Sequence, residues 1–107
     1  MKVTVVRGGG IAGLVTTTSA DTNALPPEQA DALRTQVEGS GLMHLPARVS
    51  GPTAQPDAFA YQVTVEDGDR VQKVSLSEDA LPPAVRSLIS WLDSVPGREQ
   101  RIAPPGA

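Results

Sequence analysis

Residues 2–18 read KVTVVRGGGIAGLVTTT, and this stretch predicts a β-hairpin at the start of the chain. Val3 and Val5 alternate with polar residues, as the period of a strand requires. The run that ends at Thr18 is rich in β-branched residues and has the composition of a second strand. Consecutive glycines between the two runs give the backbone access to the positive φ angles of a tight turn. The glycine-rich segment 8–13 is therefore the expected tip of this hairpin.

A second hairpin is predicted further along the chain, over residues 59–76. Its first strand has the clearest alternation in the sequence, with an apolar residue at every second position: Phe59, Tyr61, Val63 and Val65. Asp67 and Gly68 then form a dipeptide that strongly indicates a hairpin turn. The predicted return strand carries Val71, Val74 and Leu76.

Each hairpin is followed by a Leu-Pro-Pro sequence that introduces a predicted helix, first at Leu25 and then at Leu81. Proline fits the first turn of a helix, because the amide hydrogen that it lacks would have no partner there. The first helix ends at Gly39-Ser40-Gly41 and has one apolar stripe, formed by Ala30, Leu33 and Val37. The second has the i, i+3, i+4, i+7 spacing of an amphipathic helix, at Val85, Leu88, Ile89 and Leu92.

These units predict an α+β fold of order ββαββα, in which a four-stranded antiparallel sheet carries two helices on one face. The other face of the sheet is left bare, as antiparallel sheets allow. Residues 1–95 are expected to form a single domain, and residues 96–107 a disordered C-terminal tail. The Pro-rich stretch 42–57 is interpreted as an extended loop, anchored by Leu42, Met43 and Leu45. The residues expected to be buried are Val3, Val5, Leu33, Val37, Tyr61, Val63, Val65, Leu88 and Leu92.

The composition of the 107-residue chain argues against several classes of partner. It has 9 Lys and Arg against 12 Asp and Glu and no basic run, so no nucleic-acid partner is expected. No stretch approaches the ~18 apolar residues of a transmembrane helix, so no membrane partner is expected. The absence of cysteine removes disulfides and thiolate chemistry. Because no signal peptide is seen either, we expect a cytoplasmic protein.

No group of residues in the sequence carries catalytic chemistry, and we expect the protein not to be an enzyme. His44 is the only histidine, and without cysteines it is a poor candidate for a metal site or a catalytic triad. Asp67 and Asp69 are explained by the turn that they flank, and Glu78 and Asp79 by capping of the second helix. We therefore expect no metal and no cofactor.

The glycine-rich segment 8–13 allows three interpretations. Its GxGxxG-like spacing would suit a nucleotide only between a strand and a helix, whereas here a Thr-rich strand follows. The segment can be a structural turn and nothing more. It can also present Ile11, a large aliphatic residue beside glycines, to a protein partner whose surface the backbone approaches closely.

A series of short motifs covers about residues 2–92, nearly the whole predicted domain. The motifs are Arg7-Gly8-Gly9-Gly10-Ile11-Ala12-Gly13, Leu25-Pro26-Pro27, His44-Leu45-Pro46, Gln55-Pro56-Asp57 through Tyr61, Val63-Thr64-Val65-Glu66-Asp67, Ala80-Leu81-Pro82, Leu88 and Trp91-Leu92. In their order and spacing, these motifs resemble the emfourin family of bacterial protein inhibitors of thermolysin-like zinc metallopeptidases.

The resemblance implies an inhibitor that blocks the active-site cleft of a thermolysin-like metallopeptidase by reversible binding and is a monomer when free. Such enzymes favour a large apolar residue just after the cleaved bond, and a rigid turn can present one with little loss of entropy. We predict partner-binding residues in the hairpin tip and in a competing Pro-rich loop: Gly8, Gly9, Gly10, Ile11, Ala12, Gly13, Gln55, Pro56 and Asp57. The alternative function is a non-inhibitory protein-interaction module that uses the exposed sheet face.

Overall fold

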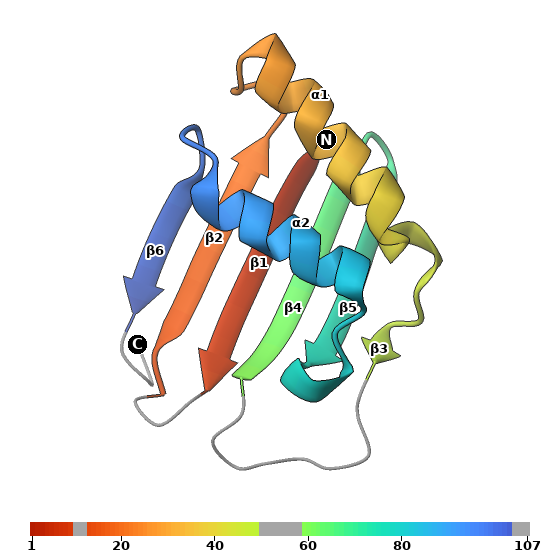
Figure 1. The fold of residues 1–107 in the computed structure, drawn as a ribbon, viewed down its shortest axis with the longest axis vertical. Coiled ribbons are helices and arrows are strands. Elements are labelled where there is room, and N and C mark those ends of the chain that lie inside the picture. Colours follow the sequence, from red (N-terminus) through yellow and green to blue (C-terminus); the bar gives the residue numbers. More distant parts are fainter. Residues whose placement is uncertain (10–12, 50–58, 104–107) are drawn as a thin grey trace.

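The computed structural model describes residues 1–9, 13–49 and 59–103. They form an α+β structure with a mixed six-stranded sheet in the order β3-β5-β4-β1-β2-β6. Two helices lie across one face of this sheet, and the other face carries no helix (Figure 1). The two layers and the helices on one face agree with the prediction.

Both predicted hairpins are present, and they supply the four inner strands of the sheet. The first consists of β1 (Lys2–Gly9) and β2 (Val15–Asp21), and the second of β4 (Phe59–Asp67) and β5 (Arg70–Ser77). β1 pairs with β4 and so joins the two hairpins at the centre of the sheet. The pairs β1–β2, β1–β4 and β4–β5 are all antiparallel. Gly68 has the positive φ of 61° that the turn between β4 and β5 requires.

The predicted number of strands is wrong, because each edge of the sheet carries a further strand. β6 (Glu99–Ala103) pairs antiparallel with β2, and β3 (Arg48–Val49) pairs parallel with β5. Part of the expected disordered tail and part of the expected loop thus belong to the sheet. Neither strand has an apolar alternation, because neither buries a side chain fully.

The two helices begin at the second proline of each Leu-Pro-Pro sequence, as α1 (Pro27–Ser40) and α2 (Pro83–Ser94). α1 ends at Gly41, whose φ of 73° is left-handed and favours glycine. Two short 3₁₀ helices, η1 (Leu42–His44) and η2 (Glu78–Ala80), follow α1 and β5. Glu78 does not cap α2, which has no side-chain cap. Among the described residues, no helix has the length and hydropathy needed to cross a membrane.

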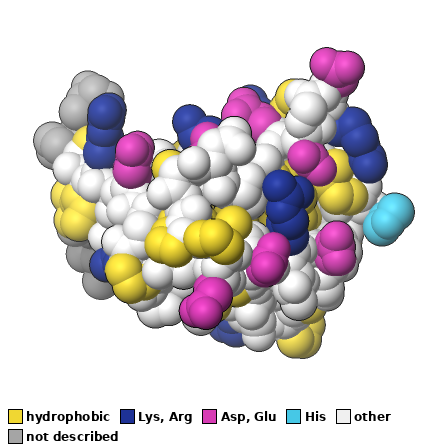
Figure 2. All heavy atoms as spheres, turned by 90° about the horizontal axis from the view of Figure 1, so that it is seen from above, with side chains coloured by type: hydrophobic (Ala, Val, Ile, Leu, Met, Phe, Trp, Pro, Cys, Tyr) yellow, Lys and Arg dark blue, Asp and Glu magenta, His cyan; other side chains and the backbone are white. Residues whose placement is uncertain are grey.

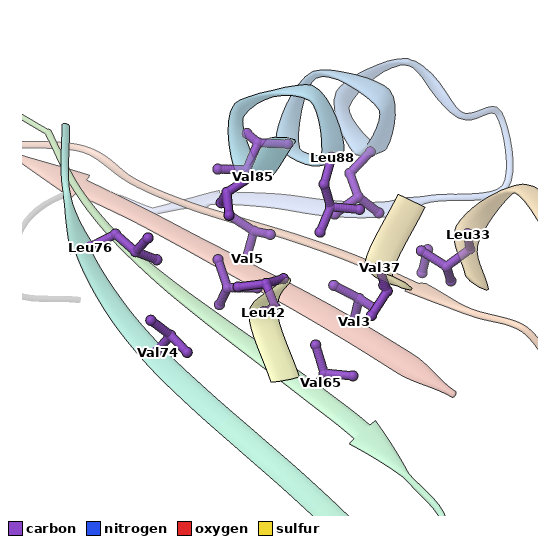
Figure 3. Packing of buried hydrophobic residues seen from close by; sticks show 14 of the residues in the cluster. Val3, Val5, Leu33, Val37, Leu42, Val65, Val74, Leu76, Val85 and Leu88 are labelled. Carbon is purple, nitrogen blue, oxygen red and sulfur yellow. The ribbon is translucent and has the colours of Figure 1, made fainter. Parts of the chain in front are cut away.

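The hydrophobic core lies between the helices and the face of the sheet that they cover. Figure 3 shows valines of β1, β4 and β5 pointing toward Leu33 and Val37 of α1 and toward Val85 and Leu88 of α2. Leu42 of η1 is also fully buried, which confirms it as the anchor of the segment after α1. Met43 and Leu45 pack against the core as partly buried residues.

Tyr61 is the one exception among the residues predicted to be buried, because it is only half-buried. It lies on the helix-covered face beside Arg7 of β1 and Leu76 of β5. The alternation of β4 therefore predicts correctly on which face of the sheet Tyr61 lies. The helices leave this end of the sheet partly uncovered, so a residue on the correct face stays accessible.

Candidate protein-binding site

The structure describes three of the nine residues predicted to bind a partner. Gly8 and Gly9 are the last two residues of β1, and Gly13 lies before β2. The others lie outside the described residues: Gly10, Ile11, Ala12, Gln55, Pro56 and Asp57. The described part of the candidate site consists of the strand ends that lead into the two predicted segments.

These strand ends lie together at one end of the sheet. Gly9, where β1 ends, is paired with Phe59, where β4 begins. Val49, where β3 ends, is paired with Leu76 of β5, which in turn is paired with Tyr61 near the start of β4. In Figure 1 these strand ends occupy the lower end of the sheet. The chain consequently enters the glycine-rich segment and the Pro-rich segment from the same end of the molecule.

The glycines at this end have different structural roles. Gly9 has a φ of 100° and Gly13 a φ of 63°, and both values lie in the region that side chains other than glycine rarely adopt. Gly8 has no such angle, and a Cβ placed on it would lie at an ordinary contact distance of 3.8 Å from Val15 Cγ2. Backbone conformation thus requires glycine at Gly9 and Gly13 and permits a small side chain at Gly8.

Phe59 is fixed through both its backbone and its ring. Its amide N–H donates a hydrogen bond of 2.8 Å to Oε2 of Glu78. Its ring lies beneath Arg7, whose Cζ is 5.1 Å from the ring centroid, in the geometry of a cation–π interaction. These contacts tie together β1, β4 and η2 at the base of both predicted segments.

Sequence reasoning missed this group of three residues. Arg7 was noted only within the glycine-rich motif, and Glu78 was interpreted as a helix-capping residue. Arg7 and Phe59 come within reach because β1 pairs with β4, and no local pattern specifies that pairing. The position of Glu78 directly after β5, opposite the start of β4, was the available signal.

An open hollow of about 580 Å³ lies beside these strand ends. Most of its lining residues alternate along the strands with buried residues, which places it on the helix-free face. The lining is largely small or aliphatic and includes Val6, Gly8, Val15, Ala60, Gln62 and Ser75. Small side chains on neighbouring strands make a depression where a partner's side chain can be received.

Leu14 adds an exposed apolar side chain at the same end, directly after Gly13. It is 44% exposed, and it is one of three large apolar residues exposed in the described part of the chain, with Val71 and Ile102. It lies between Gly13 and the first residue of β2, Val15.

The described residues offer no arrangement for metal chemistry. No group of three or more His, Asp or Glu side chains within ranges 1–9, 13–49 and 59–103 could hold a metal ion. His44 is exposed on η1. Figure 2 shows acidic and basic side chains interspersed over the opposite end of the molecule, without a large area of one sign.

Comparison with known proteins identifies a family and no individual relative. The emfourin family model matches residues 5–93, which include nearly all of both hairpins and both helices and the whole of both predicted binding segments. Searches of curated proteins and of solved structures found no significant match. Emfourins are an inhibitor family, so the match suggests a protease-inhibitor role with a protease as partner, consistent with a protein that is not an enzyme. On a match that covers most of its length, this chain belongs to the emfourin family.

Proposed function

We propose that the protein is a reversible inhibitor of thermolysin-like metallopeptidases, which binds in the active-site cleft of the enzyme. Contact is made by the end of the sheet that leads into residues 8–13 and 55–57. The observation that carries this proposal is the pairing of Gly9 with Phe59, because it brings the entrances of both segments to one place. Family membership independently supports inhibition of a protease.

A fixed base beneath the binding segments favours tight binding. Phe59 is held by the Glu78 carboxylate and by Arg7, so the strands that carry the two segments are oriented before the enzyme arrives. Strand ends that are already held in place lose little further entropy on binding. Ile11 is the large apolar residue of the glycine-rich segment and is proposed to enter the enzyme pocket that receives such a side chain.

Inhibition assays on the Ile11→Ala variant test this role. Interface anchors commonly cost about 2 kcal/mol when truncated, so the inhibition constant against a thermolysin-like enzyme should rise by roughly thirtyfold. The unfolding midpoint should stay unchanged. Val71→Ala is the matched control, because it removes an exposed aliphatic side chain at the opposite end of the sheet, beside the β4–β5 turn, and should leave inhibition unchanged.

The remaining outcomes separate the site from the function. If Ile11→Ala lowers the unfolding midpoint and leaves inhibition intact, Ile11 packs against the hairpin and does not contact the enzyme. If variants at Gln55, Pro56 and Asp57 lose inhibition instead, the Pro-rich loop is the contact. If the wild-type protein fails to inhibit thermolysin-like enzymes, or inhibits a serine-protease control equally well, the proposed function is wrong.

The second candidate function is a protein-interaction module that uses the helix-free face. The observation that favours it is the hollow lined by Gly8, Ala60 and their neighbours. Ala60 is exposed on β4, so Ala60→Arg should fill this face without disturbing the core. Loss of partner binding by Ala60→Arg, with full binding retained by Ile11→Ala, would favour this alternative over the hairpin tip.

The inhibitor is proposed to be a monomer at the low concentrations of an inhibition assay and to form a one-to-one complex. Analytical ultracentrifugation of the mixture should then show a single complex with the summed mass of enzyme and inhibitor.

A further inference from the structure

The outer edge of β6 is the more open of the two edges of the sheet. β6 is the outermost strand beside β2 (Figure 1), and four of its five residues are exposed. At the other edge, the segment after α1 lies against β5, where Gln72 Nε2 donates a hydrogen bond of 2.9 Å to the Leu45 carbonyl oxygen. In the part of the chain that the structure describes, no strand pairs with the outer side of β6. Such an edge is a template for a further strand.

Two charged residues of β6, Glu99 and Arg101, share the helix-free face. Gln100 between them points to the helix side, because its Nε2 donates a hydrogen bond of 3.0 Å to Oγ1 of Thr18, which is buried under the helices. Alternation along a strand then directs Glu99 and Arg101 to the opposite face.

The neighbouring strand of the same chain does not balance these charges. β2 pairs Ser19 with Glu99 and Thr17 with Arg101, and both partners are neutral. An acidic and a basic residue two positions apart are self-complementary in an antiparallel pair, because each can face the opposite charge on an identical strand.

We propose that β6 binds the β6 strand of a second copy of this chain, antiparallel and about a two-fold axis at Gln100. In this register, each Glu99 faces the Arg101 of the other copy, which gives two cross-strand ion pairs on the helix-free face. Shifting the axis to Arg101 would place the two Arg101 side chains opposite each other and is disfavoured. Two six-stranded sheets would then continue as one.

This contact is small and independent of the proposed inhibitory site. It uses one five-residue strand from each copy, far less than the surface of a stable dimer, so association is weak and depends on concentration. β6 also lies beyond residues 5–93 of the family match. The self-association is therefore expected of this chain and of relatives with the same strand, whether or not residues 8–13 bind a protease.

Sedimentation velocity of the full chain from about 10 μM to about 1 mM tests the proposal, since weak contacts associate in this range. The average mass of the wild-type protein should rise from that of a monomer toward that of a dimer as its concentration increases. The rise should be smaller at high salt, because salt screens ion pairs. Glu99→Arg and Arg101→Glu each turn both ion pairs into like-charge pairs, and each should weaken association by about tenfold or more.

Mixing the two variants provides the decisive measurement. An equimolar mixture of Glu99→Arg and Arg101→Glu again places opposite charges across the strands and should restore the dimer, as should the double variant. Glu38→Arg and Arg86→Glu make the same charge changes at exposed helix positions and should leave association at the wild-type level. A wild-type protein that stays monomeric at about 1 mM overturns the proposal. So does a mixture that associates no better than either single variant.

Discussion

Gly8 and Gly9 are neighbours in β1, yet the backbone constrains only the second. Gly9 has a φ of 100°, so Gly9→Ala forces a side chain into a disfavoured conformation and should lower the free energy of unfolding by about 1–3 kcal/mol. Gly8 has room for a methyl group next to Val15. Gly8→Ala should therefore leave stability unchanged or raise it slightly, because it reduces the freedom of the unfolded chain. Urea unfolding of both variants measures the difference.

The same two variants also distinguish a glycine that the backbone conformation requires from a glycine that the enzyme contact requires. Equal losses of stability in the two variants would contradict the assignment of strain to Gly9 alone. If Gly8→Ala is stable but weakens protease inhibition, the small size of this residue serves the enzyme contact. The same variant with full inhibition would leave Gly8 without a role at the interface.

Single residues also mark the limit of what local patterns predict. Gly97 follows Pro96 shortly after α2, and this dipeptide by itself indicates only the end of a helix. In the structure, a Cβ on Gly97 would overlap the Leu25 side chain, so this glycine allows the segment after α2 to pack closely against the start of α1. That contact joins residues far apart in the sequence, and no spacing within either segment indicates it.

At the scale of elements, α2 supplies the most dependable prediction. Leu88 is fully buried between the helices and the sheet, so Leu88→Ala should lower the free energy of unfolding by about 2–5 kcal/mol through lost burial and a cavity. Ser87→Ala changes an exposed neighbour on the same helix and should stay within about 0.5 kcal/mol of wild type. Chemical denaturation followed by circular dichroism measures both. A loss below about 1 kcal/mol for Leu88→Ala would mean that α2 does not pack as described.

Elements with a buried face were predictable, and those without one were not. α2 and β4 place an apolar residue toward the core at each expected period, so their spacing indicates both the element and its face. β6 consists of Glu99, Gln100, Arg101, Ile102 and Ala103, and Ile102 is 65% exposed. Backbone hydrogen bonds to β2 hold this strand, and such bonds leave no periodic signal in the sequence. The two residues of β3 are too short to show a period.

The turn that carries the predicted binding residues was predictable from the sequence, but the packing around it was not, and its role in binding stays a prediction. Consecutive glycines after an alternating strand indicated a turn, and the positive φ of Gly9 agrees with that. The group formed by Arg7, Phe59 and Glu78 depends on β1 pairing with β4 across about 50 residues of sequence. The hollow depends on five neighbouring strands, β3, β5, β4, β1 and β2, whose residues come together only in the assembled sheet.

At the scale of the whole molecule, nearly all of the burial lies on one side of the sheet. The buried core cluster runs from Val3 to Leu92, and its members come from the four inner strands, both helices, η1 and the approach to α1. β6 lies outside this cluster and is joined to β2 by strand pairing and by the Gln100–Thr18 hydrogen bond. The cooperative unit of folding should therefore reside in the residues before β6.

A chain that ends at Arg98 tests this distribution of stability. It should still unfold in one cooperative step, because every residue of the core cluster remains. Its free energy of unfolding should fall by about 1–3 kcal/mol, since β2 loses its pairing with β6 and the buried Thr18 hydroxyl loses its Gln100 partner. The fluorescence of Trp91, the only tryptophan, reports the transition from a position packed against the core. A shortened chain that is unfolded or melts gradually would show that β6 belongs to the cooperative unit. A shortened chain that folds and still inhibits would place both stability and protease binding in the two hairpin–helix units.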